Sequence, residues 1–366
     1  MKIPFLSPDI REEDIRRMVK SVKSGWLVYG PNAEELEKAL AKHFRAPYAV
    51  LLSSCTAALH EALILAGVKE GDEVIVPALS WVSSSDIIIY QGATPVFADV
   101  DARTGLIDIT DVEKKITPKT RAIIVVHTYG QMVDMKAFAA LGKKHNLPII
   151  EDAAHAVESV RDGERPGELG FAACLSFHSA KNITSGQGGA LILQHEALEK
   201  RARIIRRNGV LGRDQNRRKR ELGYKYDGTD FQAALLIGQL KRIKSTHKAR
   251  QAVFARYDKA FKGHNKIWTL ENVKNSIHAC HMYPIFVDPA KRDAVREKLR
   301  EAGVETSIHW EAIHLEPYYR AKFGFKEGMC PVSEEMGASE ITLPTYSRLT
   351  KKQQDYVIKN VLEAVE

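Results

Sequence analysis

The chain has 366 residues, of which 44% are hydrophobic and 27% are charged, a composition typical of globular proteins that is sufficient for two domains. No apolar run approaches the roughly 20 residues that a membrane-spanning helix needs. The first residues, MKIPF, lack the apolar segment of a signal peptide. We therefore expect a cytoplasmic protein that is not bound to a membrane.

The four cysteines, at positions 55, 174, 280 and 330, are scattered along the chain and form no C-x-x-C pair. Zinc sites and many disulfide frameworks show recognisable cysteine spacings, and this sequence shows none. We therefore expect free thiols in a reducing compartment and no metal site.

The formal net charge is +8, and its excess is concentrated in residues 200–225, which hold eleven lysines and arginines but only two acidic residues. Such a segment is most often a solvated helix face or loop. It is also able to form an electropositive surface for an anionic ligand. No recognised nucleic-acid-binding module accompanies the charge, so we do not expect a nucleic-acid partner.

Apolar, β-rich runs alternate with helical patterns through the first two-thirds of the chain. Strands are predicted at 73–77, 94–98, 121–127, 147–150 and 189–193, and a helix at 135–145. This alternation predicts an α/β fold with a mainly parallel sheet that is covered by helices on both faces. Ligands of such sheets gather at the carboxyl ends of the strands.

A long helical pattern at 228–259 is interpreted as the bridge into a second domain. It is followed by a predicted strand at 283–288, a helix at 290–302, a loop at 309–319 and a terminal helix at 351–366. This order predicts a large domain over residues 1–240 and a small α+β domain over residues 241–366.

An aspartate at a predicted strand end precedes a lysine in a Ser/Gly-rich loop by about one βα unit. Asp152 lies in IEDAAHA at 150–156, and Lys181 lies in LSFHSAKNITSGQGG at 175–189. Pyridoxal 5'-phosphate (PLP) chemistry needs this pair, because the lysine holds the aldehyde as a Schiff base and the aspartate keeps the pyridine nitrogen protonated. The order of these residues predicts a PLP enzyme.

These motifs resemble the DegT/DnrJ/EryC1/StrS family of PLP-dependent, fold-type I sugar aminotransferases. Nearly the whole chain takes part, through SGWLVYGP (24–31), SSCTAAL (53–59), GATPVFADVD (92–101), VHTYGQ (126–131), YKYDGTD (224–230) and IHLEPYY (313–319). The resemblance implies a mainly parallel, seven-stranded sheet in the large domain.

The resemblance also implies roles for individual residues. Lys181 and Asp152 are the catalytic residues, and Lys181 also moves a proton between the sugar carbon and the cofactor. His155 is implied to contact the phenolic oxygen of the cofactor, and Trp81 to stack on its ring. Cys55, Thr56 and Ser176 are implied to bind its phosphate. The family more often has glycine where Cys55 stands. The alternative explanations are a helix cap for Asp152, core packing for His155 and Trp81, and a simple N-cap for the turn at Cys55 and Thr56.

Two further sets of residues are assigned by the resemblance. Asn208 corresponds to an asparagine that reaches the phosphate of the neighbouring subunit's cofactor, which implies a homodimer with shared active sites. A turn asparagine before glycine is the alternative. Candidates for substrate contact are Tyr29, Lys225, His309 and His314, each of which is equally compatible with packing or an interface, and Gln187 is compatible with a backbone turn.

The implied reaction transfers an amino group, from L-glutamate in most of the family, to a keto group of a nucleotide-linked deoxysugar. The product feeds a surface polysaccharide, a lipopolysaccharide or a glycosylated metabolite. We interpret the basic segment as suited to the substrate diphosphate. Three alternatives stay open: a cyclitol aminotransferase, a PLP-dependent sugar dehydratase and a non-catalytic regulatory or binding protein. Dehydratase relatives typically carry histidine in place of the lysine, and Lys181 argues against that alternative.

Overall fold

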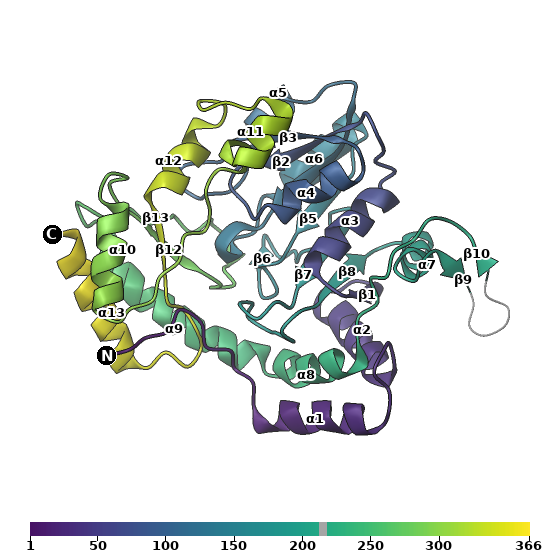
Figure 1. Cartoon of the computed structure of the whole chain (residues 1–366), viewed down its shortest axis with the longest axis horizontal. Coiled ribbons are helices and arrows are strands. Elements are labelled where there is room, and N and C mark those ends of the chain that lie inside the picture. Colours follow the sequence, from purple (N-terminus) through teal and green to yellow (C-terminus); the bar gives the residue numbers. More distant parts are fainter. Residues whose placement is uncertain (212–217) are drawn as a thin grey trace.

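A seven-stranded sheet forms the centre of the computed structural model, which describes residues 1–211 and 218–366 (Figure 1). The strand order is β1-β8-β7-β5-β4-β2-β3. Neighbouring strands from β3 to β7 are parallel, and β8 runs antiparallel to both β7 and β1. The bounds are β1 Tyr48–Leu52, β2 Glu73–Pro77, β3 Thr94–Ala98, β4 Thr120–Val126, β5 Ile149–Asp152, β7 Ala172–Ser176 and β8 Gly189–Leu193. The predicted α/β fold class is confirmed.

The predicted strands at 73–77, 94–98 and 189–193 have the bounds of β2, β3 and β8. The strand predicted at 147–150 begins two residues later, because residues 146 and 147 still close the helix before it. Asn146 adopts a left-handed conformation with φ 54°, and the Leu147 amide donates to the Gly142 carbonyl across 2.8 Å. This is a common way for a helix to end.

Helices cover both faces of the sheet. On one face α3 (Cys55–Leu65), α4 (Ser83–Tyr90) and α7 (Glu196–Ile205) share a buried core with alternate strand residues such as Val50 and Leu52. On the other face, α2 (Pro31–His43) and α8 (Asp230–Lys241) pack on Ala49 and Leu51, while α5 (Ile109–Lys114) and α6 (Met135–His145) pack further along the sheet. Burial on both faces explains why the strands are almost continuously apolar.

A second core lies beside the sheet, at the left of Figure 1. It is formed by the antiparallel pair β12 (Tyr283–Phe286) and β13 (Glu340–Leu343) with α9 (Ile243–Phe261), α10 (Arg292–Glu301) and α13 (Lys351–Val365). Residues of β12, β13 and all three helices form one buried cluster. These elements give the small α+β unit that the sequence predicts after the long helical pattern.

The helical pattern at 228–259 contains two helices instead of one, because α8 ends at Lys241 and α9 begins at Ile243. Packing crosses the predicted boundary at residue 240 in both directions. Ile3 belongs to the second core, whereas Ile313 and Tyr319 belong to the core of the sheet. The division into residues 1–240 and 241–366 therefore stays a prediction.

The other elements are short or peripheral. A hairpin of β9 (Val210–Leu211) and β10 (Arg218–Lys219) projects from the body beyond α7, and α1 lies along α8 (Figure 1). None of the described helices is both long and apolar enough to span a bilayer. The remaining bounds are α1 Glu12–Lys23, α11 Pro317–Phe323, α12 Pro331–Ser339, β6 Val160–Arg161, β11 Ser276–Ile277, and two 3-10 helices, Thr128–Gly130 and Ile313–Leu315.

Candidate active site

Asp152 occupies the carboxyl end of β5, in the interior of the sheet. Its side chain is buried, with Oδ2 accepting a hydrogen bond from the Ser84 hydroxyl at 2.8 Å and Oδ1 accepting one from the Ala154 amide at 3.1 Å. These bonds fix the carboxylate at the edge of the sheet where ligands of parallel α/β folds gather. Ser84 was not predicted from the sequence, although it lies in the first turn of a helix shortly after Trp81.

Neighbouring residues of β5 face opposite sides of the sheet, as strand geometry requires. The fully buried Glu151 accepts from the Gly167 amide at 2.9 Å and pairs with His127 at 2.8 Å. This separate set of partners shows that Glu151 points away from the Asp152 side.

Lys181 lies in the loop between β7 and β8. Its amide donates to the His178 carbonyl at 2.9 Å, while Phe177 and Ser185 bond to each other across the base of the loop. Burial lowers the pKa of the Lys181 amine from 10.5 to about 8, and the nearby Asp152 and Cys55 oppose the shift. Roughly one amine in ten is then uncharged at pH 7, compared with roughly one in three thousand at the ordinary value. The amine is suited to attack a carbonyl and to exchange protons.

The N-terminus of α3 approaches the same edge of the sheet. Ser54 caps the helix by accepting from the Ala57 amide at 3.0 Å, and Cys55 and Thr56 follow in the first turn. The Cys55 thiol lies 4.0 Å from Asp152 Oδ1. Burial raises the pKa of this thiol well above its ordinary value, and the negative charge of Asp152 raises it further. First-turn N–H groups have no acceptor within the helix, so this turn is suited to bind a phosphate.

Gly189 allows the sheet to pass directly under this turn. A Cβ at this position would lie 2.3 Å from the Ser54 carbonyl carbon and 2.5 Å from the Cys55 nitrogen. Only glycine fits such an approach. The double glycine that follows the lysine loop in the sequence therefore shapes the cradle at the α3 N-terminus.

His155 lies in an aromatic stack that joins the two cores. Its ring is parallel to that of Trp310, with centroids 5.2 Å apart, and it contacts the ring of His281 at 4.5 Å. Burial and the charge of Lys181 lower the pKa of both His155 and His281 well below the ordinary value, so both rings are neutral at pH 7. Sequence analysis missed His281 and Trp310, which come from the second half of the chain.

Trp81 and Ser176 have room for a ligand. Trp81 is 59% exposed, and Ser176 ends β7, where its hydroxyl accepts only a long 3.4 Å bond from the His178 amide. His309 also belongs to this region, since burial and then the charge of Lys181 lower its pKa to about 4. A buried carboxylate, a low-pKa lysine and a helix N-terminus fit the ring nitrogen, aldehyde and phosphate of PLP.

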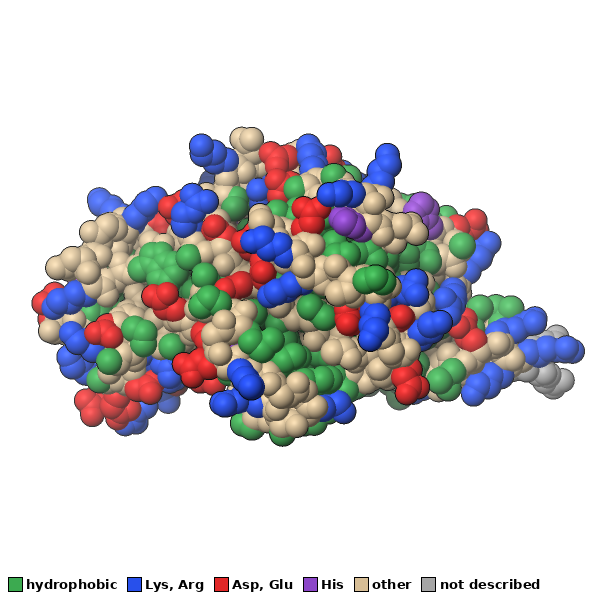
Figure 2. All heavy atoms as spheres, turned by 90° about the horizontal axis from the view of Figure 1, so that it is seen from above, with side chains coloured by type: hydrophobic (Ala, Val, Ile, Leu, Met, Phe, Trp, Pro, Cys, Tyr) green, Lys and Arg blue, Asp and Glu red, His purple; other side chains and the backbone are tan. Residues whose placement is uncertain are grey.

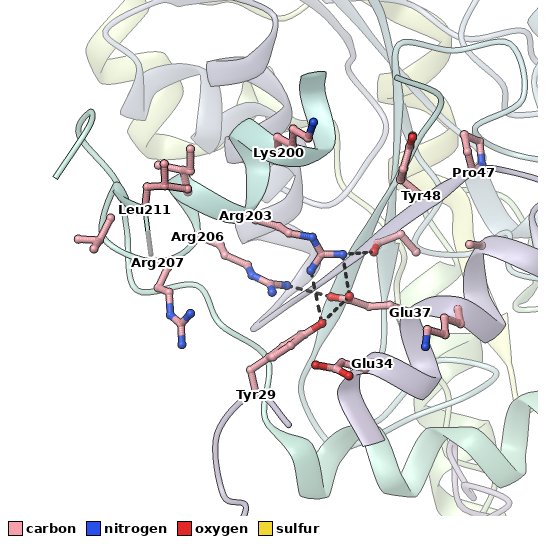
Figure 3. A pocket seen from close by; sticks show the side chains of 15 residues that line it. Tyr29, Glu34, Glu37, Pro47, Tyr48, Lys200, Arg203, Arg206, Arg207 and Leu211 are labelled. Atoms are coloured by element: carbon pink, nitrogen blue, oxygen red, sulfur yellow. Dashed lines mark hydrogen bonds and ion pairs between the residues drawn. The ribbon is translucent and has the colours of Figure 1, made fainter. Parts of the chain in front are cut away.

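Tyr29 lies elsewhere, in an open pocket of about 800 Å³ between α2, β1, α7 and β9 (Figure 3). Its hydroxyl donates to Glu37 at 2.7 Å, and the Arg206 guanidinium lies 4.4 Å above its ring. Neither Lys181 nor Asp152 lines this pocket. In this single chain, Tyr29 is held by an ion-pair cluster instead of facing the lysine.

The other predicted residues are exposed or bond to partners other than Lys181. Asn208 is exposed in a left-handed turn with φ 57°, before the projecting hairpin. Lys225 is exposed and pairs with Asp227 at 2.8 Å. His314 is fully buried, and its Nε2 pairs with Glu334 at 2.8 Å. Gln187 is exposed, and its carbonyl closes a turn with Ser185 at 2.6 Å.

The basic segment carries less free charge than its sequence suggests. Five of its side chains form ion pairs within the chain, namely Lys200 with Glu196, Arg201 with Glu221, Arg203 and Arg206 with Glu37, and Lys225 with Asp227. Residues 218–220 are exposed at the projecting end, where Figure 2 shows lysines and arginines together. Arg213 and Arg217 lie outside the described residues.

Comparisons with known proteins identify the family of the chain. The sequence model of the DegT/DnrJ/EryC1/StrS aminotransferase family matches residues 8–362. The spore coat polysaccharide biosynthesis protein SpsC of Bacillus subtilis is 35% identical over 378 aligned positions, covering 100% of this chain and 97% of that protein.

Two proteins of known structure share the whole fold. The putative sugar aminotransferase Spr1654 from Streptococcus pneumoniae, solved in PLP and PMP forms, superposes with a TM-score of 0.95 at 30% identity, over 100% of this chain and 98% or more of that one. Helicobacter pylori PseC, an aminotransferase of pseudoaminic acid biosynthesis, gives 0.94 at 25% identity, over 100% and 99%. The chain therefore belongs to the DegT/DnrJ/EryC1/StrS family of PLP-dependent sugar aminotransferases.

Proposed function

We propose that this enzyme transfers an amino group from L-glutamate to the keto group of a nucleotide-linked deoxysugar. The observation that carries the proposal is the meeting of Lys181, with its pKa of about 8, and the buried Asp152 at one edge of the sheet. When bound, PLP supplies a ring that accepts the electron pair from the carbon beside the amino group. The similarity to proteins of polysaccharide and pseudoaminic acid biosynthesis supports a sugar destined for a cell-surface polymer or glycoconjugate.

In this proposal each residue of the site contacts a different part of the cofactor. Asp152 would hold a proton on the ring nitrogen, because Ser84 fixes its side chain at this edge of the sheet. The first turn of α3, at Cys55 and Thr56, binds the phosphate together with Ser176. Trp81 covers the ring, and His155 contacts the phenolic oxygen.

Lys181 does the proton transfers of both half-reactions. A lysine with a pKa of about 8 gains and loses a proton readily near neutral pH, which is the requirement for a general acid and base. The direction of transfer follows the substrate present, so one amine serves the glutamate carbon and the sugar carbon.

We also propose a homodimer in which Asn208 reaches the partner's cofactor phosphate. Its exposed turn at the base of the projecting hairpin supports this role, because an exposed side chain is accessible to a partner subunit. Tyr29, Lys225, His309 and His314 stay candidates for contact with the nucleotide-sugar. Of these, His309 is supported best, because its pKa responds to the charge of Lys181. The free cysteines remain our reason to place the reaction in the cytoplasm.

An absorbance spectrum tests the reaction directly. The purified protein is loaded with PLP, and spectra are recorded before and after addition of L-glutamate. We expect the band of the lysine-linked cofactor to be replaced by that of pyridoxamine phosphate, and then to return when keto-sugar nucleotides are supplied. A protein that binds no PLP, or whose spectrum responds to no amino donor, would contradict the proposal.

A further inference from the structure

The residue after the active-site lysine is tied to a distant part of the chain. The Asn182 side-chain nitrogen donates to Glu158 Oε2 at 2.8 Å and to the Ala279 carbonyl at 3.0 Å, and its oxygen lies 3.1 Å from His281 Nδ1. Ala279 and His281 immediately precede β12 of the second core. The peptide that carries Lys181 is therefore anchored to the segment that enters that core.

These contacts fix the position of a proton. Both acceptors of the Asn182 nitrogen are oxygens without hydrogens, so the amide orientation is determined by its neighbours. The amide oxygen of Asn182 only accepts, which requires His281 Nδ1 to be the donor. Because His281 is neutral, its Nε2 carries a lone pair and no proton.

The other side of Asn182 is held firmly. Glu158 pairs with Arg250 of α9, and both side chains are buried. A chain of contacts thus runs from Arg250 through Glu158 and Asn182 to His281. It ends at His281 Nε2, a buried atom with no hydrogen-bond partner among the described residues.

A second nitrogen in the same state lies beside it. Nδ1 of His155 is also buried and without a hydrogen-bond partner in the part of the chain that the structure describes. The rings of His155 and His281 are 4.5 Å apart and tilted by 35°. An unsatisfied buried polar atom is costly, and turning these two contacting rings edge to edge, so that the two nitrogens pair, removes both costs.

We propose that Asn182 and His281 are positioning residues for the Lys181 reaction, with Asn182 fixing the tautomer of His281 and His281 Nε2 accepting a hydrogen bond from His155 Nδ1–H. His155 is then left with Nε2 as a proton acceptor for the group bound beside Lys181. The inference rests on the proposed function of Lys181 and adds to it a route by which the second core sets the protonation of the site.

Two isosteric variants separate this role from simple packing. In His281→Asn the amide nitrogen takes the place of Nδ1, so the bond to Asn182 is kept and the Nε2 acceptor is removed. In His281→Gln the amide reaches the position of Nε2 instead. The charged and titratable groups around this ring are Lys181, His155, His309, Arg250 and His278, and all are unchanged in both variants.

The holoenzyme is measured in three ways: thermal stability, the pH titration of the lysine-linked cofactor band, and kcat and KM for the amino donor. For His281→Asn we expect a nearly unchanged melting temperature, a titration midpoint displaced by about 0.5 pH unit or more, and kcat reduced about tenfold with little change in KM. For His281→Gln we expect partial rescue of the midpoint and of kcat, at a lower melting temperature.

A His281→Asn enzyme with the wild-type midpoint and kcat would overturn the inference. The ¹⁵N chemical shifts of the wild-type holoenzyme give a test that needs no variant to fold, because they distinguish histidine tautomers. We expect Nδ1–H for both His155 and His281, and Nε2–H at either ring would also overturn it. If Lys181→Ala kept wild-type turnover, the proposed function itself would fail, whatever the result at His281.

Discussion

The Ser84 hydroxyl donates a 2.8 Å hydrogen bond to Asp152 Oδ2, although 68 residues separate the two side chains in the sequence. Ser84 itself is fully buried at the start of α4 and lies 3.0 Å from the hydroxyl of Ser80. The bond holds the carboxylate that is proposed to keep the cofactor ring protonated. If Asp152 has this role, electron acceptance by the cofactor ring depends on α4, a helix distant in sequence from both Asp152 and Lys181.

Removing this hydroxyl is expected to weaken catalysis without abolishing it. Ser84→Ala deletes one of the bonds to Asp152, and a hydrogen bond to a charged group contributes about 1.5–3 kcal/mol, so kcat falls about 10- to 100-fold. Ser85→Ala is the matched control, because Ser85 is equally buried but bonds to Tyr319 instead. Steady-state kinetics compare the two variants, and equal losses would show that Ser84 has no specific effect on Asp152.

Gly189 is expected to be essential for cofactor affinity. In Gly189→Ala the new methyl group overlaps the Ser54 carbonyl and the Cys55 nitrogen, which displaces the first turn of α3 and raises the PLP dissociation constant at least about tenfold. Fluorescence titration of the apoprotein with PLP measures the change.

Gly186→Ala controls for the general cost of alanine at this loop. Gly186 has φ +82° but no atom within 4 Å of the added methyl group, so only backbone strain is introduced. PLP affinity that fell equally in both variants would indicate loop strain and not a clash at the α3 turn.

Glu61 is predicted to make stability depend on pH. Its side chain is fully buried on α3, with no hydrogen-bond partner for either carboxylate oxygen among the described residues. Burial raises its pKa from 4.5 to about 9. Between these values the folded state binds more protons than the unfolded state, so the contribution of Glu61 to stability falls as pH rises through this window.

Glu61→Gln cannot ionise and is expected to remove this dependence. The melting temperature of the variant relative to wild type should increase steadily from pH 4.5 to pH 8, by roughly 2 °C for each kcal/mol of relief. The comparison uses the trend with pH because the buried amide has its own constant cost. Parallel melting curves for the two proteins over this range would contradict the prediction.

The proposed sharing of active sites between two subunits predicts complementation between two defective variants. Lys181→Ala is expected to lose turnover and the lysine-linked absorbance band, whereas Lys143→Ala, an exposed lysine of α6, keeps both. Asn208→Ala is expected to lose much of its activity through weaker phosphate binding. Subunits of Lys181→Ala and Asn208→Ala, unfolded and refolded together, form hybrids in which one of the two sites is intact.

If the variants pair at random, half of the dimers are hybrids with half of their sites intact, so the mixture regains about one quarter of wild-type activity. Activity that only equals the average of the two separate variants would show that Asn208 acts within its own subunit, or not at all.

Local patterns in the sequence were sufficient for the strands and for the central chemical pair. Strands such as β2 and β8 are buried on both faces and therefore appear as short, continuous apolar runs. Asp152 ends one strand and Lys181 follows another, and carboxyl ends of parallel strands share one edge. For this reason, spacing along the chain was enough to predict the position of Asp152 and the Lys181 loop.

Charge was predicted less well, because a count of residues does not show their partners. Arg203 and Arg206 belong to the basic segment in the sequence, but both pair with Glu37 of α2, more than 150 residues away. Arg206 is buried, and the pairing with Glu37 makes this possible, because a buried charge requires a partner. Only the fold shows that much of the positive charge is neutralised inside the chain.

The sequence by itself determined the class of fold, the cofactor and the lysine, because each depends on a local run of residues or on one strand end. Tertiary structure decided which residues contact these elements. Ser84 bonds to Asp152, Gly189 lies under the first turn of α3, and Asn182 links the Lys181 loop to His281. These contacts join segments from separate strands, helices and cores. Their hydrogen bonds depend on orientation and on distances of about 3 Å, which no spacing along the chain encodes.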